Sequence, residues 1–146
     1  MRVLYPFVGD TVGGSHHSSR ILISELGKAG LEPVVVVHCD GPLKSFLQDN
    51  CVTTYPNIGN LPYWKSHQNI VLRFFSWIQV SMFLWRVLVK LKVQMVHVND
   101  ARMMISWAFA CRLARIPLIV HQRTVFAPSR ISELSLKMAT HVISIS

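Results

Sequence analysis

Short apolar runs alternate with longer segments of mixed apolar and polar residues along the whole chain. A continuous run such as residues 33–37, with four successive valines, is typical of a strand buried on both faces, as in a parallel sheet. Six strands are expected, over residues 3–7, 33–37, 52–55, 95–99, 118–121 and 140–146. The segments between them carry apolar residues at helical spacing, which predicts helices over residues 16–29, 43–48, 70–93, 101–115 and 128–138.

This alternation of short strands with helices predicts the fold class. It indicates an α/β protein with a Rossmann-like parallel sheet and helices on both faces. The chain has 146 residues, enough for one domain with a sizeable core. We therefore interpret residues 1–146 as a single Rossmann-like domain.

The most apolar part of the chain, residues 70–93, admits two interpretations. A membrane span needs about 20 apolar residues, and Arg73, Arg86 and Lys90 interrupt this segment. A long helix in a two-layer core is the favoured interpretation. The alternative is a basic amphipathic helix that lies on an anionic bilayer.

The first expected strand leads into a glycine-rich turn. Gly13, Gly14 and Ser15 precede the helix expected from His16. Glycines let a ligand approach the backbone closely, and a helix start presents unpaired N–H groups to an anion. Ser15 suits the N-cap position of that helix. The turn therefore predicts an anion site, although neither the dinucleotide-binding nor the P-loop glycine pattern is present, and a tight turn without ligand is the alternative.

Asn99 and Asp100 form a polar step at the end of a buried strand. In open α/β sheets, ligands gather at the carboxyl ends of the strands. A second interpretation is that Asp100 caps the helix that follows. The two interpretations are compatible.

Composition adds constraints on the partners. Charged residues make up 15% of the chain, below the usual share of roughly 25%, which predicts apolar surface covered by a second domain, a partner or a membrane. The net charge of +8 favours anionic partners. The basic residues are spread along the chain, and no basic tract or nucleic-acid-binding motif is present, so a phosphate-bearing ligand or membrane surface is favoured over nucleic acid.

Cysteine usage indicates a reducing compartment. Cys39, Cys51 and Cys111 are an odd number and none belongs to a C-x-x-C motif. We expect free thiols in a cytoplasmic protein, each acting as a small buried residue. The sequence carries no zinc-ligand spacing, so no metal site is expected, and the N-terminus lacks the pattern of a signal peptide.

Taken in order, five segments resemble the N-terminal domain of retaining GT-B glycosyltransferases of the family-4 type. The resemblance covers most of the chain, and its specificity lies in the order and spacing of the segments. They are the Gly13-Gly14-Ser15 loop with the helix after it, and residues 30–34, 96–100, 116–123 and 141–146.

The resemblance implies an enzyme with two Rossmann-like domains and an active site in the cleft between them. The first domain would bind mainly the acceptor, and the second would supply most of the nucleotide-sugar site, including an E-x7-E motif. This sequence contains no such second half. The resemblance therefore implies the N-terminal, acceptor-binding domain of a larger glycosyltransferase, inactive alone, which transfers a hexose from a nucleotide-sugar donor to a saccharide or lipid-linked acceptor.

Roles for individual residues also follow from the resemblance. Gly13, Gly14 and Ser15 would bind the donor, and Asn99, Asp100 and Arg123 the acceptor. His121 would lie near the transferred sugar as the catalytic residue; from the sequence alone, a packed strand-end histidine is the alternative. No cofactor is implied, since the nucleotide sugar is a substrate. The implied work is cell-surface polysaccharide biosynthesis in the cytoplasm, peripheral to the inner face of the membrane.

Three other classes of protein compete with this interpretation. A non-catalytic Rossmann-like module could bind an anionic small molecule or a partner chain. A flavodoxin-like or response-regulator-like domain needs a Ser/Thr-rich phosphate loop or an acidic cluster, which Thr11, Ser15, Asp10 and Asp100 supply poorly. A two-carboxylate hydrolase is disfavoured because no close carboxylate pair stands at the strand ends.

Overall fold

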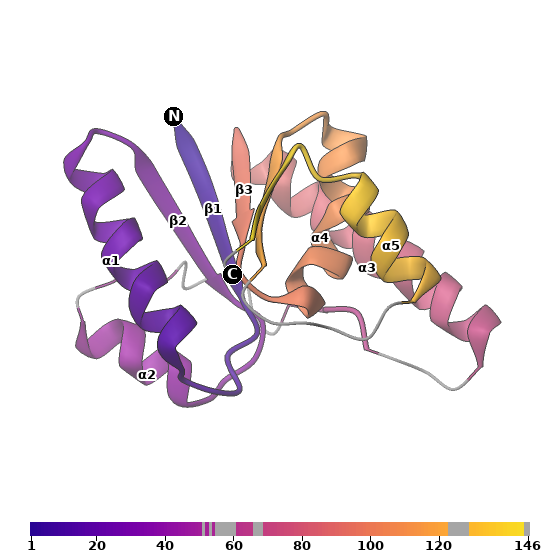
Figure 1. Cartoon of the computed structure of the whole chain (residues 1–146), viewed down its shortest axis with the longest axis horizontal. Helices are drawn as coiled ribbons and strands as arrows, with labels where there is room; N and C mark the ends of the chain where they lie inside the picture. The colour runs from indigo at the N-terminus through magenta and orange to yellow at the C-terminus, as the bar shows by residue number, and fades with distance from the viewer. Residues whose placement is uncertain (51, 53, 55–60, 66–68, 123–128, 145–146) are drawn as a thin grey trace.

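The computed structural model describes residues 1–50, 52, 54, 61–65, 69–122 and 129–144 (Figure 1). Within them, strands and helices follow one another in an α/β order. They are β1 (Arg2–Phe7), α1 (Gly14–Lys28), β2 (Glu32–Val37), α2 (Pro42–Asp49), α3 (Ile70–Lys90), β3 (Met95–Val98), α4 (Ala101–Ala114), β4 (Leu118–Gln122), α5 (Arg130–Lys137) and β5 (His141–Ser144).

The strands form one parallel sheet in the order β2-β1-β3-β4-β5. From β1 the chain moves outward to β2 and then returns to β3 on the other side of β1. The direction of winding therefore reverses between β1 and β3. Figure 1 shows α1 and α2 on one side of the sheet and α3, α4 and α5 on the other. The predicted Rossmann-like fold class is confirmed.

Two apolar cores hold these layers together. Successive side chains of a strand point to opposite faces of the sheet. Tyr5 of β1 accordingly packs in a cluster with Ile23 of α1 and Leu43 of α2, whereas its neighbour Leu4 packs with the residues of α3 and α4. Burial on both faces accounts for the continuous apolar runs in the sequence.

The expected cap at Ser15 is wrong. Helix α1 begins at Gly14 with Gly13 as its N-cap, so Ser15 lies inside the first turn. The His16 side chain closes this turn, because its Nδ1 accepts the Gly13 N–H at 3.0 Å while the Gly13 carbonyl accepts the His16 N–H at 2.9 Å. At the other end the helix stops before Gly30, whose φ of +80° suits glycine.

The described residues contain five strands rather than the expected six. Of the segment 52–55, Thr54 makes a single parallel bridge to Val35 of β2, and residues 53 and 55 lie outside the described part. The last expected strand is β5, which ends at Ser144.

Helix α3 is a core helix over most of its length. Its inner stripe is buried against α4, and the Trp77 indole N–H donates to the Ile105 carbonyl at 2.7 Å. This confirms the favoured interpretation for the part that follows Trp77. Among the described residues, α3 is the one helix long and apolar enough to cross a membrane, by length and composition only, and core helices of soluble proteins meet the same criteria.

The cysteines partly match expectation. Cys39 and Cys111 are free thiols, and burial raises the pKa of both. Cys111 is buried, whereas Cys39 is half-buried and its thiol donates to the Val8 carbonyl at 2.9 Å. Cys51 lies outside the described residues.

A buried histidine ties β2 to the opposite layer. His38 follows β2, and its Nδ1 lies 3.2 Å from the Leu61 carbonyl and 3.1 Å from that of Pro62. Its Nε2 lies 3.1 Å from the Trp107 indole nitrogen, which carries a hydrogen and must donate. Nε2 is therefore unprotonated and Nδ1 carries the ring hydrogen. Burial agrees with this neutral form, because it lowers the pKa of His38 to about 4.

Candidate functional site

The carboxyl ends of β1 and β3 meet where the winding of the sheet reverses. This is the place where open α/β sheets bind ligands. A hollow of about 30 Å³ lies there, and its walls come from β1, the turn after it, the start of α1 and the step from β3 into α4. The lining residues are Pro6, Phe7, Val8, Asp10, Ser15, His16, Asn99, Asp100 and Arg102. We call this edge of the sheet, together with the carboxyl end of β4, the rim.

Arg102 joins two carboxylates across the hollow. Its guanidinium contacts Asp10 at 2.5 and 3.2 Å and Asp100 at 3.3 and 3.4 Å. The hydrogen bond from Arg102 is the main reason why the pKa of Asp10 lies below its usual value. The turn after β1 is thereby fixed to the first turn of α4.

Asp100 is the N-cap of α4. Its Oδ1 accepts the backbone N–H of Arg102 at 2.7 Å and that of Met103 at 3.4 Å. The capping interpretation from the sequence is confirmed. Because one carboxylate oxygen serves the helix and both face Arg102, much of the hydrogen-bonding capacity of Asp100 is taken up within the protein.

Asn99 connects β3 to α1. Its Nδ2 donates to the Ser19 hydroxyl at 2.5 Å, and that hydroxyl donates to the Ser15 carbonyl at 2.7 Å. The Asn99 Oδ1 is buried and has no hydrogen-bond partner among the described residues. The chain therefore orients this amide and leaves its acceptor atom open to a donor from elsewhere.

Four glycines lie in the turns near the rim, and contacts within the described chain require glycine at only two of these positions. A Cβ on Gly9, whose φ is +111°, would lie 2.2 Å from the Cys39 carbonyl oxygen, and a Cβ on Gly41 would lie 2.4 Å from that of Gly9. The fold therefore requires both. A Cβ on Gly13 would approach nothing closer than the His16 ring at 4.0 Å, and one on Gly14 would meet nothing within 4 Å. No contact within the described chain explains these two glycines.

His121 ends a row of three rings across the sheet. The rings of Tyr5, His97 and His121 come from β1, β3 and β4; the first two centroids are 5.3 Å apart, and the two histidines stack at 6.0 Å and 9°. Burial raises the pKa of Tyr5 to about 12. On the same face, Phe7 contacts His16 of α1 at 5.7 Å. His121 and the glycine turn thus lie at the rim on the side of the sheet that α1 covers, with β3 between their strands.

Sequence reasoning found some rim residues and missed others. It placed Asn99, Asp100 and the two glycines at the rim, and Arg123 lies outside the described residues. It missed the pairing of Arg102 with Asp10, which joins residues far apart in the chain. His16 had a local signal, because a side chain three positions after an N-cap can reach back to it.

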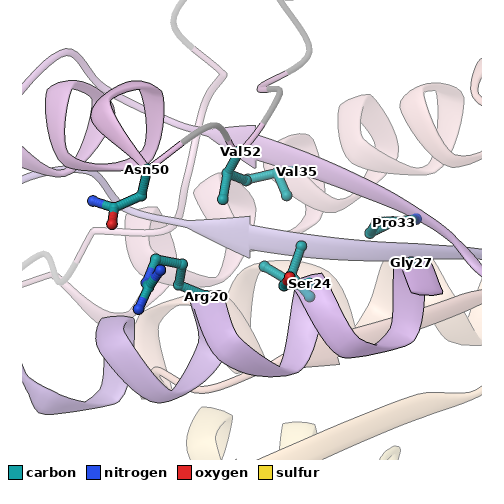
Figure 2. A pocket seen from close by; sticks show the side chains of 8 residues that line it. Arg20, Ser24, Gly27, Pro33, Val35, Asn50 and Val52 are labelled. Carbon is teal, nitrogen blue, oxygen red and sulfur yellow. The ribbon is translucent and has the colours of Figure 1, made fainter. Parts of the chain in front are cut away.

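The described residues offer no group of three or more His, Cys, Asp or Glu that could hold a metal ion. They do contain a second hollow of about 360 Å³, away from the rim (Figure 2). It lies beside α1 and β2, and its polar lining comes from Arg20, Ser24 and Asn50. None of the residues predicted from the sequence as functional lines it.

The described residues form a Rossmann-like fold with a small hollow at the reversal of winding. Residues 12–146 match the family model described as Glycosyltransferase Family 4, and the chain belongs to that family. No curated protein matches the sequence.

Several solved structures share the fold. MurG of Acinetobacter baumannii is 18% identical with a TM-score of 0.71, and 98% of this chain covers 40% of it. HepE of Anabaena, solved in complex with UDP, is 18% identical with a TM-score of 0.61, and 97% of this chain covers 37% of it. A protein of Listeria monocytogenes described as a putative UDP-N-acetylglucosamine 2-epimerase is 13% identical with a TM-score of 0.63, and 99% of this chain covers 39% of it. The chain thus spans about two fifths of the length of these proteins.

Proposed function

We propose that this chain is the N-terminal, acceptor-binding domain of a glycosyltransferase. The complete enzyme transfers a sugar from a nucleotide-sugar donor to a saccharide or lipid-linked acceptor, and a C-terminal domain supplies most of the donor site. Membership of Glycosyltransferase Family 4 supports the reaction class. The single observation that carries the site is the rim, where the glycine turn, Asn99 and His121 share one edge of the sheet.

The glycine turn receives the donor's diphosphate. Gly13 and Gly14 have open space where a side chain would be, and they begin α1. The N–H groups of a helix start and the positive end of its dipole stabilise the negative charge on a diphosphate leaving group. Ser15 follows in the same turn. This accounts for two glycines that no contact within the described chain requires.

The acceptor lies toward β3 and β4. The buried Asn99 Oδ1 accepts a hydrogen bond from an acceptor hydroxyl, since no described residue supplies a donor. Asp100 borders this side while holding α4, and Arg123 contacts an anionic group of the acceptor. His121 faces the transferred sugar, where an oxocarbenium-like transition state develops charge. The reaction needs no cofactor, because the nucleotide sugar is itself a substrate.

The site of action is the cytoplasmic face of a membrane. Enzymes that add sugars to lipid-linked acceptors in cell-surface polysaccharide biosynthesis must reach an acceptor anchored in a bilayer. The basic, apolar character of this chain suits that location.

Sugar-nucleotide turnover by the full-length protein tests the proposal, with two matched glycine variants. Gly14 and Gly27 both belong to α1, and a Cβ at either position meets nothing within 4 Å. Gly14→Val places a branched side chain where the diphosphate lies, so kcat/KM falls by roughly 100-fold. Gly27→Val, in the last turn of the same helix, stays within about twofold of wild type.

Equal rates for both variants and wild type would remove the donor role of the turn. A wild-type protein that binds nucleotide through this chain but turns over no sugar nucleotide would instead support the non-catalytic binding module.

A further inference from the structure

The larger hollow, beside α1 and β2, has the size of a small-molecule site. Its volume is about 360 Å³, and pockets for small ligands measure about 300 to 1,000 Å³. Figure 2 shows α1 along one side of it, with residues of β2 and of the segment after α2 on the other side. None of its lining residues also lines the hollow at the rim. We call it the side hollow.

Arg20 is the cation in the lining of the side hollow, and it has no partner among the described residues. Its Nε is buried and makes no hydrogen bond to them. The other three Lys and Arg of residues 1–49 all form ion pairs, which are Arg2–Glu32, Lys28–Glu25 and Lys44–Asp40. None of the described residues in the lining is acidic. A guanidinium that is partly removed from water and left without a carboxylate favours an anion from elsewhere.

Two polar side chains near Arg20 can complete an anion site. Asn50 and Arg20 lie at the same end of the side hollow (Figure 2), and Ser24 follows Arg20 by one turn on the same face of α1. The Asn50 Nδ2 donates one N–H to the Phe46 carbonyl at 2.8 Å, which orients the amide. Its second N–H and the Ser24 hydroxyl make no hydrogen bond to a described residue, so both can donate to an oxyanion.

The rest of the lining is apolar. Ile23 of α1 and Val35 of β2 are buried in one core cluster, and Val52 packs against the same cluster. Pro33 extends this surface along β2, away from Arg20 (Figure 2). An inorganic ion would leave the apolar surface in contact with water. A charged end next to an apolar wall is typical of a site for a small organic molecule.

We infer that the side hollow binds a small organic anion. Arg20 pairs with the carboxylate or phosphate group of this ligand, since a guanidinium holds either group through two parallel hydrogen bonds. The apolar part of the ligand lies against Val35 and Val52. Residues 1–49 hold four Lys and Arg against five Asp and Glu, so this part of the chain has no general excess of positive charge. Anion binding there therefore depends on Arg20 itself, and it does not depend on which ligand binds the rim.

Saturation-transfer NMR on the full-length protein tests the inference, with phenyl phosphate and benzoate as separate probes. At least one probe binds with a Kd of about 1 mM or below, and the stronger of the two identifies the anionic group. Inorganic phosphate, which lacks an apolar part, displaces the probe only at concentrations at least about tenfold higher. Excess UDP does not displace the probe, because the side hollow is separate from the rim.

Three variants locate the bound probe. Arg20→Gln raises its Kd at least about tenfold, because the anion loses its cation. Ser24→Trp, at an exposed position of α1, fills the side hollow and weakens binding to a similar extent. Lys28→Gln is the matched control, since it removes a positive charge from the same helix outside the lining, and it keeps the wild-type Kd.

Three results would overturn the inference. They are no binding of either probe by the wild-type protein, a wild-type Kd in Arg20→Gln, and displacement of the probe by UDP. The first would leave the side hollow as a solvated groove, and the last would place the probe at the rim. Sugar-nucleotide turnover is measured separately without probe, so failure here is distinguishable from failure of the proposed sugar transfer.

Discussion

Arg102 holds together residues that the chain brings to the rim from far apart. It lies near the start of α4 and reaches both Asp10, in the turn after β1, and Asp100, at the end of β3. These contacts neutralise part of the negative charge of the two carboxylates. A rim that receives a diphosphate needs such compensation, because uncompensated carboxylates repel the ligand.

Replacement of Arg102 should therefore weaken the binding of the nucleotide sugar. In Arg102→Gln, Asp10 and Asp100 lose their common cation, so we expect the KM of the full-length protein to rise about 3- to 10-fold, a modest change because these side chains are partly exposed to solvent. Lys44→Gln is the matched control, since Lys44 of α2 forms an ion pair with Asp40 and neither residue lines the rim hollow. Steady-state kinetics at fixed acceptor measures the difference. An unchanged KM in Arg102→Gln would show that the contacts of Arg102 with Asp10 and Asp100 play no part in binding the donor.

Some residues of the rim could be predicted from the sequence, and others could not. Asn99 and Asp100 could be placed because a polar step after an apolar run marks the carboxyl end of a strand. The pairing of Arg102 with Asp10 could not be predicted, because it joins positions 92 residues apart through the tertiary fold. Ser15 was predicted as the N-cap from its residue type alone, whereas the N-cap is Gly13, two residues earlier, whose N–H donates to the His16 side chain.

At the scale of elements, two βα turns fit against each other. Gly9 is in the turn after β1 and Gly41 is in the turn after β2, and a Cβ on Gly41 would lie 2.4 Å from the Gly9 carbonyl oxygen. The left-handed backbone of Gly9 adds a second reason for glycine at that position. This close approach fixes the two turns on which one side of the rim is built.

His38 should make the stability of the protein depend on pH. Its pKa is about 4 in the folded protein and about 6.5 in an unfolded chain. Below pH 6.5 the unfolded chain binds a proton that the folded protein excludes, so the free energy of unfolding is highest above pH 6.5 and falls as the pH drops toward 4. We expect a contribution of roughly 2–3 kcal/mol between pH 7 and pH 4.5.

Urea unfolding at these two pH values measures this contribution. His38→Gln loses the titrating group, so the difference between its two unfolding free energies becomes smaller by about that amount, even if its stability at pH 7 is lower. His141→Gln, at an exposed position of β5, keeps the wild-type difference. A His38→Gln protein with the full wild-type difference would show that His38 does not titrate in this range.

Elements were predicted well where the sequence pattern and the burial agree. The valine run of β2 and the apolar stripe of α3 were recognisable because buried elements leave such patterns. The segment 52–55 read as a full strand from its composition, yet one bridge through Thr54 is its only described pairing. Strand pairing depends on neighbours that are distant in sequence, and composition alone does not report them.

At the scale of the whole molecule, the alternation of strands and helices was sufficient to predict the layers but not the strand order. The reversal between β1 and β3 results from the path of the chain after α2, and no local pattern encodes it. That reversal brings the ends of β1, β3 and β4 together into one rim.

Sugar transfer by the full-length protein, with His121→Ala compared with His141→Ala, tests most directly whether this rim is half of a transfer cleft. His121 ends the ring row at the carboxyl end of β4, whereas His141 begins β5, the strand beside it. If the rim is half of a transfer cleft, kcat falls by roughly 100-fold in His121→Ala and stays within about twofold of wild type in His141→Ala. Transfer at the wild-type rate by both variants would contradict it.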